Sequence, residues 1–358
     1  MDPLRGIRIR RRQAETSLEV AKPFRKPQSA LFAERALRFL FLYLIEVMGD
    51  LKMILFFQTC LVAVTVSSMY TLVALGFTMY VGVINLANFS HGDTCVLASF
   101  LMMPLIVPLL GLNLSPAVTF AVVMGVSLVT LLLAGVWGSL FYKMLVRPLL
   151  NSPRLILLLA TVAAGQVLRE VIRVVYPNGS NPQVFPEILP FGGFLFGDLF
   201  LGYDVVIICG VSMVMIVLLN LLIKKTRLGL AMRAVSQNPD VSQTVGINLE
   251  RTITLVFVIG SALAGIAGIL NASYYGITKF DIGSNLGIKG FSAAVIGGLG
   301  DFNGAIVGGL ILGFVETFSA VYIPDGSQYQ NVFSFLAVIA FLIVRPRGVL
   351  GENVFEKV

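Results

Sequence analysis

Eight apolar runs follow one another between residues 53 and 344, and they limit what this chain can fold into. A helix that crosses a lipid bilayer needs about 20 mainly apolar residues, and every run except the last approaches or exceeds that length. Charged residues make up 13% of the sequence, against about 25% in a soluble domain. We therefore predict an all-α, polytopic membrane protein, a helical bundle of about eight full spans. The runs are Met53–Phe77, Thr94–Leu110, Ala117–Leu140, Leu155–Val175, Val205–Ile223, Ile253–Leu270, Ala305–Ile323 and Val332–Val344.

Positive charge alternates between the loops that connect these runs. Basic residues cluster at Lys143, Arg147 and Arg154, within Lys224–Arg251, and at Arg345, Arg347 and Lys357. The segments Gly111–Pro116, Tyr176–Asp204 and Pro324–Asn331 contain no Lys or Arg. Because cytoplasmic loops carry the excess of Lys and Arg, we expect Lys224–Arg251 and the C-terminus inside and Tyr176–Asp204 outside.

Residues 1–52 differ from the rest, with 11 basic and 6 acidic residues. Counting spans back from Lys224–Arg251 places this basic extension outside, against the charge rule. A translation start at Met48 or Met53 would remove the conflict, and a real extension that breaks the rule is the alternative. We therefore divide the chain into an N-terminal extension, 1–52, which is disordered or not translated, and a membrane domain, 53–358.

The segment 224–251 is the longest polar interruption in the membrane domain. Leu230, Ala231, Ala234 and Val235 recur at helical spacing, which predicts a short helix that ends near the Asn-Pro pair at 238–239. A second short helix is expected from Asp240, whose carboxylate would cap it, to Gly246, which would end it. Two such helices would form a surface on which a cytoplasmic partner could push.

Glycine and polar residues interrupt two further apolar segments, one in each half of the chain, at 82–93 and 283–304. Irregular backbone at membrane depth survives only where protein or a water-filled cavity satisfies it. Paired broken segments of this kind indicate a transport pathway, so the bundle is expected to contain two broken or re-entrant segments. The first holds the single histidine, His91, and Asp93, which could cap the next helix. Both residues could be purely structural, or they could line the pathway.

Other residues that could carry chemistry are few. Glu316 lies within an apolar run, where an acid is a functional candidate or a hydrogen-bonded packing residue. Arg169 and Arg173 share a helix face, and Glu170 can pair with Arg173 at i,i+3. The sequence has no Walker-type nucleotide loop, no metal-ligand spacing and no nucleophile triad. We therefore expect no catalytic residues, no metal site, no nucleic-acid partner and, if ATP drives this protein, an ATP site in another chain.

Three motifs resemble the permeases of ABC importers for branched-chain amino acids. NFSHGD at 88–93 is similar to the family's Asn-Phe-Ala-His-Gly-Glu, with Ser90 and Asp93 as departures. KGFSAAVIGGLG at 289–300 is similar to its Lys-x-Phe-x-Ala-Ala-Val-x-Gly-Gly-x-Gly. RAVSQNPDVSQTVGIN at 233–248 resembles its coupling loop, although the two alanines of the general importer pattern Glu-Ala-Ala are absent. The resemblance runs from about residue 53 to the C-terminus.

The resemblance implies a permease subunit in the plasma (inner) membrane that moves branched-chain or other neutral amino acids by alternating access. Its implied partners are a second, homologous permease subunit in a heterodimer, two ATP-binding subunits, an extracytoplasmic substrate-binding protein and the membrane lipid. ATP would be bound by the partner subunits, so this chain itself would hold no cofactor. The implied pathway residues are Asn88, His91, Asp93, Lys289, Gly297, Gly298, Gly300 and Glu316. The implied coupling residues are Arg233, Asp240, Ser242 and Gly246.

Two alternatives stay open at this point. A sibling of the same family could carry urea or short-chain amides, because the fold serves several small polar solutes. An ion-coupled secondary transporter could instead use Glu316 or Asp93 as its proton carrier. The absence of other acids in the middle of a run and the presence of the coupling loop argue against the second alternative.

Overall fold

The computed structural model describes residues 28–112 and 115–351, with side chains from residue 52 onward. In this part, eight helices are long and apolar enough to cross a membrane, which confirms the predicted helical bundle. Four spans run clearly further than expected, since the first continues to Ile84, the third continues to Leu149, the sixth covers Leu249–Tyr275, and the last begins at Gly326. The spans are Lys52–Ile84, His91–Leu110, Pro116–Leu149, Arg154–Val175, Tyr203–Lys225, Leu249–Tyr275, Phe302–Tyr322 and Gly326–Val344.

The chain forms two compact units, Met1–Phe56 and Phe57–Val358, and the second contains the bundle. Of the N-terminal extension, residues 28–52 belong to the first helix, and residues 1–27 lie outside the described part. The helices are α2 (Gln28–Ile84), α3 (His91–Leu110), α4 (Pro116–Phe141), the π-helical turn η1 (Tyr142–Val146), α5 (Arg147–Leu149), α6 (Arg154–Val175), α7 (Tyr203–Lys225), α8 (Arg227–Gln237), α9 (Pro239–Thr244), α10 (Leu249–Tyr275), α11 (Ile282–Gly297), α12 (Phe302–Tyr322) and α13 (Gly326–Val344).

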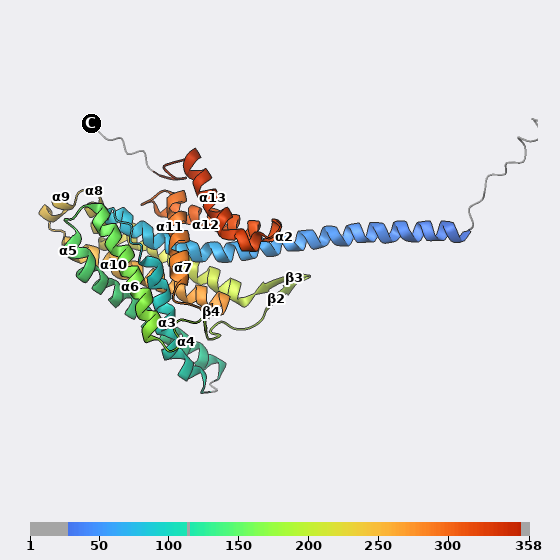
Figure 1. Ribbon diagram of the computed structural model, residues 1–358, viewed down its shortest axis with the longest axis horizontal. Coiled ribbons are helices and arrows are strands. Elements are labelled where there is room, and N and C mark those ends of the chain that lie inside the picture. Colours follow the sequence, from blue (N-terminus) through green and yellow to red (C-terminus); the bar gives the residue numbers. More distant parts are fainter. Residues whose placement is uncertain (1–27, 113–114, 352–358) are drawn as a thin grey trace, which may run out of the picture. The chain divides into compact units, whose positions relative to one another are not determined.

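Four short strands lie in the connections of the described part of the chain. Strand β1 (Gln183–Val184) pairs antiparallel with β4 (Ile277–Thr278), and β2 (Gly193–Phe196) pairs antiparallel with β3 (Leu199–Gly202). Gly197, at φ +63°, opens the two-residue turn of the β2–β3 hairpin, a position that glycine fills without strain. Within the second unit, this hairpin lies at the end opposite to α8 and α9 (Figure 1). We call these the hairpin end and the α8–α9 end.

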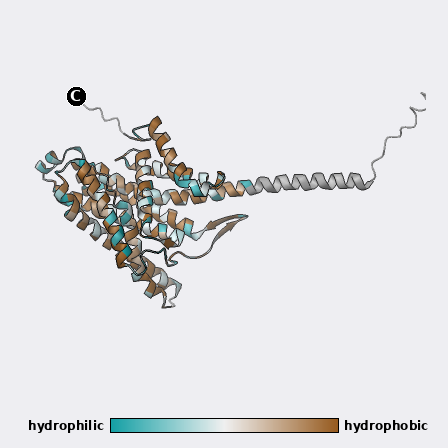
Figure 2. Cartoon of the chain, viewed as in Figure 1, coloured by the Kyte–Doolittle hydropathy of each residue, from teal (hydrophilic) through white to brown (hydrophobic). Residues whose placement is uncertain are grey.

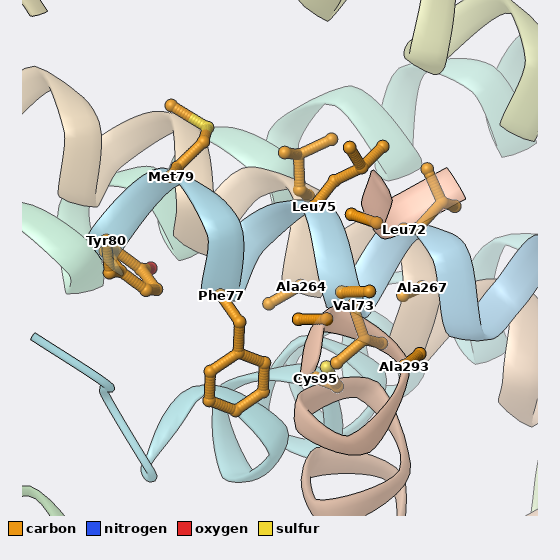
Figure 3. Packing of buried hydrophobic residues seen from close by; sticks show 14 of the residues in the cluster. Leu72, Val73, Leu75, Phe77, Met79, Tyr80, Cys95, Ala264, Ala267 and Ala293 are labelled. Atoms are coloured by element: carbon orange, nitrogen blue, oxygen red, sulfur yellow. The ribbon is translucent and has the colours of Figure 1, made fainter. Parts of the chain in front are cut away.

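Helices α2 and α10 form the centre of the bundle. In each of these two helices 72% of the apolar stretch is buried. In the spans of α4 and α13 only 11% is buried, so these two spans present apolar side chains to the surroundings. Such exposed apolar surface is expected of helices that face lipid or a partner subunit. Large side chains of α2 pack against small residues of the neighbouring helices, among them Cys95 of α3, Ala264 and Ala267 of α10 and Ala293 of α11 (Figure 3). The polar loops gather around α8 and α9, whereas the hairpin is largely apolar (Figure 2).

The first broken segment is non-helical between Asn85 and Ser90, and α3 begins at His91. A Cβ at Gly76 would overlap His91, so the first turn of α3 contacts α2 eight residues before that helix ends. Eight helical residues correspond to roughly 12 Å. The chain therefore turns back toward the hairpin end through this non-helical segment and starts α3 inside the bundle.

The second broken segment differs from the sequence expectation, because most of it is regular helix. Helix α11 covers Ile282–Gly297, and the break is confined to residues 298–301. The helix tolerates its glycines because they allow close packing: a Cβ at Gly283 or Gly287 would press on α3 at Gly92. Here tertiary packing overrides the low helix propensity of glycine.

Candidate functional site

A buried ion pair joins α11 to α12 within the bundle. Lys289 Nζ lies 2.6 Å from Glu316 Oε1, and their side chains are only 9% and 6% exposed. Tyr70 of α2 donates its hydroxyl to the same carboxylate oxygen at 2.9 Å and accepts from Lys289 Nζ at 3.1 Å. Ser334 of α13 donates to Glu316 Oε2 at 3.2 Å. Four helices thus meet at one charged cluster, in which three donors satisfy the carboxylate.

The cluster lies beside a pocket of about 280 Å³, close to the lower end of the range of ~300–1,000 Å³ for ligand sites. We call it the polar pocket. Its position between the last turn of α10, the start of α11 and the start of α13 places it toward the hairpin end. The lining residues are Tyr70, Asn271, Tyr275, Ile277, Ile282, Asn285, Leu286, Lys289 and Gln330.

His91 lies deeper in the bundle, in an aromatic surround. Its ring contacts Phe77 and Tyr80 edge-on, with centroids 5.0 and 5.3 Å apart. Both ring nitrogens are buried and have no hydrogen-bond partner among the described residues. Nearby, Asn88 Oδ1 accepts from the backbone N–H and the hydroxyl of Ser90, at 3.2 and 3.0 Å, and so stabilises the turn that precedes α3.

The sequence suggested that Asp93 could cap α3, but it does not. The N-cap position is Ser90, and Asp93 lies in the first turn. Its carboxylate forms an ion pair with Arg169 of α6 at 2.9 Å, and it is 1% exposed against 21% for the arginine side chain. A Cβ at Gly165 would overlap the Asp93 carboxylate, so this glycine gives the acid its space. The expected pair of Glu170 with Arg173 is present at 2.6 Å.

The turn between α11 and α12 is shaped by three glycines, Gly297, Gly298 and Gly300. None of them belongs to the charged cluster. Gly298 and Gly300 adopt φ of +112° and +92°, a region that side chains rarely enter. Gly297 lies against Gly304, and Gly300 lies near Gly82 of α2. The backbone N–H groups of Val349 and Leu350 donate to the carbonyls of Ile296 and Gly297, at 2.9 and 3.0 Å. The segment after α13 therefore completes the end of α11.

The predicted pair of short helices, α8 and α9, is present between α7 and α10. The cap of α9 was assigned wrongly, because Asn238 Oδ1 accepts from the N–H groups of Asp240 and Val241, at 3.0 and 3.1 Å. Pro239 occupies the first helical position, which leaves the residue before it as the cap. Gly246 ends this region with φ +87°, as expected for a left-handed residue.

The coupling residues lie on different faces of this loop. Arg233 donates to the Ile223 carbonyl at the end of α7, and Ser242 is buried, whereas Asp240 and Gly246 are exposed. Beside them is an open cleft of about 560 Å³ between η1–α5 and the start of α10. Arg147 and Glu250 bridge its sides at 2.9 Å, and Gly246 lines it.

Sequence reasoning found Lys289 and Glu316 separately but missed their pairing and the partners Tyr70 and Ser334. It placed Arg169 on one helix face with Arg173 but did not pair it with Asp93. The contacts of this cluster span 18 to 246 residues along the chain, so no local pattern reports them. The available signal was charge balance: a lysine and an acid in separate apolar segments favour each other as partners.

Residues 60–343 match the family described as branched-chain amino acid transport system, permease component. The chain belongs to this family. It is therefore a multi-pass transport permease component and not an enzyme. Within the described ranges, no group of three His, Cys, Asp or Glu residues could hold a metal ion.

Several relatives align with most of this chain and with nearly all of their own length. The high-affinity branched-chain amino acid transport system permease protein BraD of Pseudomonas aeruginosa is 34% identical over 310 residues, which are 85% of this chain and 98% of the relative. The permease protein LivH of Escherichia coli K12 is 32% identical over 313 residues, with the same coverage. A probable LivH of Methanocaldococcus jannaschii is 28% identical over 305 residues, 81% of this chain and 91% of the relative. No solved structure matches the chain.

Proposed function

We propose that this permease is the membrane subunit of an ATP-driven importer for branched-chain or other neutral amino acids, and that it works by alternating access. The observation that carries the proposal is the 34% identity to a branched-chain amino acid permease over 98% of that protein's length. The polar pocket agrees with it, since apolar, amide and cationic side chains converge there as a zwitterion with a hydrocarbon side chain requires.

The energy source is proposed to be ATP hydrolysis in two partner subunits that dock on α8, α9 and the adjacent cleft. These helices project at one end of the bundle, and Asn238 and Gly246 fix their ends, so they are suited to transmit motion. Asp240, exposed on α9, and Gly246, which lines the cleft, would contact the partner. Arg233 and Ser242 would hold the docking surface in place.

We place the α8–α9 end and the C-terminus in the cytoplasm, because the basic loops lie there. The hairpin end would then face an extracytoplasmic substrate-binding protein, and the polar pocket would receive the released solute. Asn285 and Ile288 of α11 are exposed, so this side of the pocket would be closed by a second, homologous permease.

The remaining pathway residues are proposed to form its closed part. His91 and its aromatic neighbours fill the interior of the bundle, and Asn88 shapes the non-helical segment that precedes α3. Asp93 would steady this segment through Arg169. Gly297, Gly298 and Gly300 provide the turn at which α11 and α12 could move relative to each other.

Reconstitution tests the proposal. The permease would be assembled in proteoliposomes with its partner permease, ATP-binding subunits and binding protein, and uptake of radiolabelled leucine would be measured with ATP or a non-hydrolysable analogue. We expect uptake only with ATP and the loaded binding protein. Uptake that is unaffected by the analogue but collapses with a protonophore would refute it.

The two alternatives make different demands on the charged cluster. An ion-coupled carrier needs an acid free to exchange protons, but Glu316 accepts from Lys289, Tyr70 and Ser334. A permease for urea or short-chain amides needs no cation in its pocket. Both alternatives are therefore less well supported than the amino acid importer.

A further inference from the structure

The polar pocket contains a single charged side chain among the described residues that line it, and this charge is positive. Lys289 reaches the pocket, whereas its partner Glu316 lies behind it and does not line the pocket. A ligand in the pocket can therefore contact the Lys289 ammonium, whereas the Glu316 carboxylate lies behind that ammonium.

Lys289 also has binding capacity left. A lysine ammonium has three N–H donors. Two of them have partners, Glu316 at 2.6 Å and Tyr70 at 3.1 Å, and the third has none among the described residues. An ammonium held in a poorly solvated site gains most from an additional anionic acceptor.

We propose that Lys289 binds the carboxylate of the transported amino acid, and that Glu316 is the resident counter-ion which balances the lysine when the pocket is empty. This inference rests on the proposed function and assigns a role within it. Bringing a zwitterion into the pocket leaves the net charge unchanged, so the ammonium can be shared between the two carboxylates without leaving a charge unpaired.

The rest of the pocket accommodates the other parts of such a substrate. The side-chain oxygens of Asn271 and Asn285 can accept from an α-ammonium group. Ile277, Ile282 and Leu286 offer an apolar surface to a hydrocarbon side chain. The pocket would therefore discriminate by charge at one end and by hydrophobicity at the other.

A purely structural ion pair is the competing explanation, and it predicts that loss of either partner harms the protein alike. Our inference predicts opposite effects on binding. Glu316→Gln removes the competitor for the ammonium and should tighten binding of a carboxylate. Lys289→Gln/Glu316→Gln removes the ammonium without leaving a charge buried alone, so the variant should fold but lose recognition of the carboxylate.

The test uses the assembled complex in nanodiscs, without the binding protein, so that only the permease selects the solute. Radiolabelled L-leucine is bound by equilibrium dialysis and displaced with unlabelled L-leucine or L-leucinamide, which lacks the carboxylate. We expect wild type to prefer leucine by about tenfold or more, the effect of one charge-assisted hydrogen bond. Glu316→Gln should increase leucine affinity several-fold, and the double variant should show no preference. Lys279→Gln is the matched control, because this lysine pairs with Asp281 at 2.7 Å outside the pocket and should leave the preference unchanged.

The inference is overturned if wild type binds leucine no better than leucinamide, or if the double variant keeps the preference. It is also overturned if Glu316→Gln weakens leucine binding as much as the double variant does. ATP-dependent leucine uptake by the wild-type complex is measured in parallel. It distinguishes failure of the role of Lys289 from failure of the proposed function. Uptake without a preference for the carboxylate would refute only the role of Lys289, whereas absence of uptake would refute the proposed function.

Discussion

Replacing Gly246 by valine isolates the contribution of one backbone conformation to the docking surface. Gly246 has φ +87°, and apart from Gly246 itself and its two chain neighbours no described heavy atom lies within 4 Å of the position that a Cβ would take. Steric overlap with neighbours therefore contributes nothing, and the cost is that of holding an L-residue in the left-handed region, roughly 1–2 kcal/mol. This strain opposes the loop conformation that follows α9 and should lower its population about 5- to 30-fold.

The ATP-binding subunit is titrated into the purified permease, and the fraction that co-purifies with the permease gives the apparent affinity. We expect the apparent affinity to fall about 5- to 30-fold for Gly246→Val, with unchanged membrane abundance and thermal stability of the bundle. Gly246→Asn is the matched control, because asparagine tolerates the left-handed conformation better than other residues. Wild-type affinity for the valine variant would refute the role of this loop, and equal losses for asparagine and valine would refute the backbone argument.

Three further outcomes follow from the fold. In a cysteine-free background, an impermeant thiol reagent applied to intact cells should label Ser180→Cys and spare Ser236→Cys, and the reverse pattern would invert the proposed topology. Gly92→Val should prevent accumulation of folded protein, measured by detergent gel filtration, because its Cβ would overlap the backbone of Gly283 in α11 at a cost of roughly 3 kcal/mol or more. Asn238→Ala should remove about 1 kcal/mol from α9 and weaken capture of the ATP-binding subunit about fivefold, whereas Asn238→Asp, which keeps a capping oxygen, should change capture far less.

The spans and the two short helices could be predicted from sequence because they depend on local patterns. Hydropathy reports the length of each span directly, and the helical spacing of Leu230 to Val235 predicted α8. The cap of α9 was also within reach, since a proline at the first helical position points to Asn238 rather than Asp240.

The site could be predicted only in parts. Lys289 and Glu316 stood out because charges are costly within apolar segments. Their partner Tyr70 comes from a helix far away in the sequence and looks like any other aromatic residue of a span. The helical state of α11 was hidden for a similar reason, because its glycines are stabilised by packing against Gly92 and not by propensity.

The bond between the segment after α13 and the end of α11 has a consequence for how the protein is made. The residues around Val349 leave the ribosome only after α12 and α13, which follow α11 in the chain. Until then the carbonyls of Ile296 and Gly297 lack the donors that complete them in the finished fold. The α11–α12 turn is therefore expected to mature only after α13 and the segment that follows it have been made, and a fusion placed between α13 and Val349 should leave this turn incomplete although α11, α12 and α13 are already present.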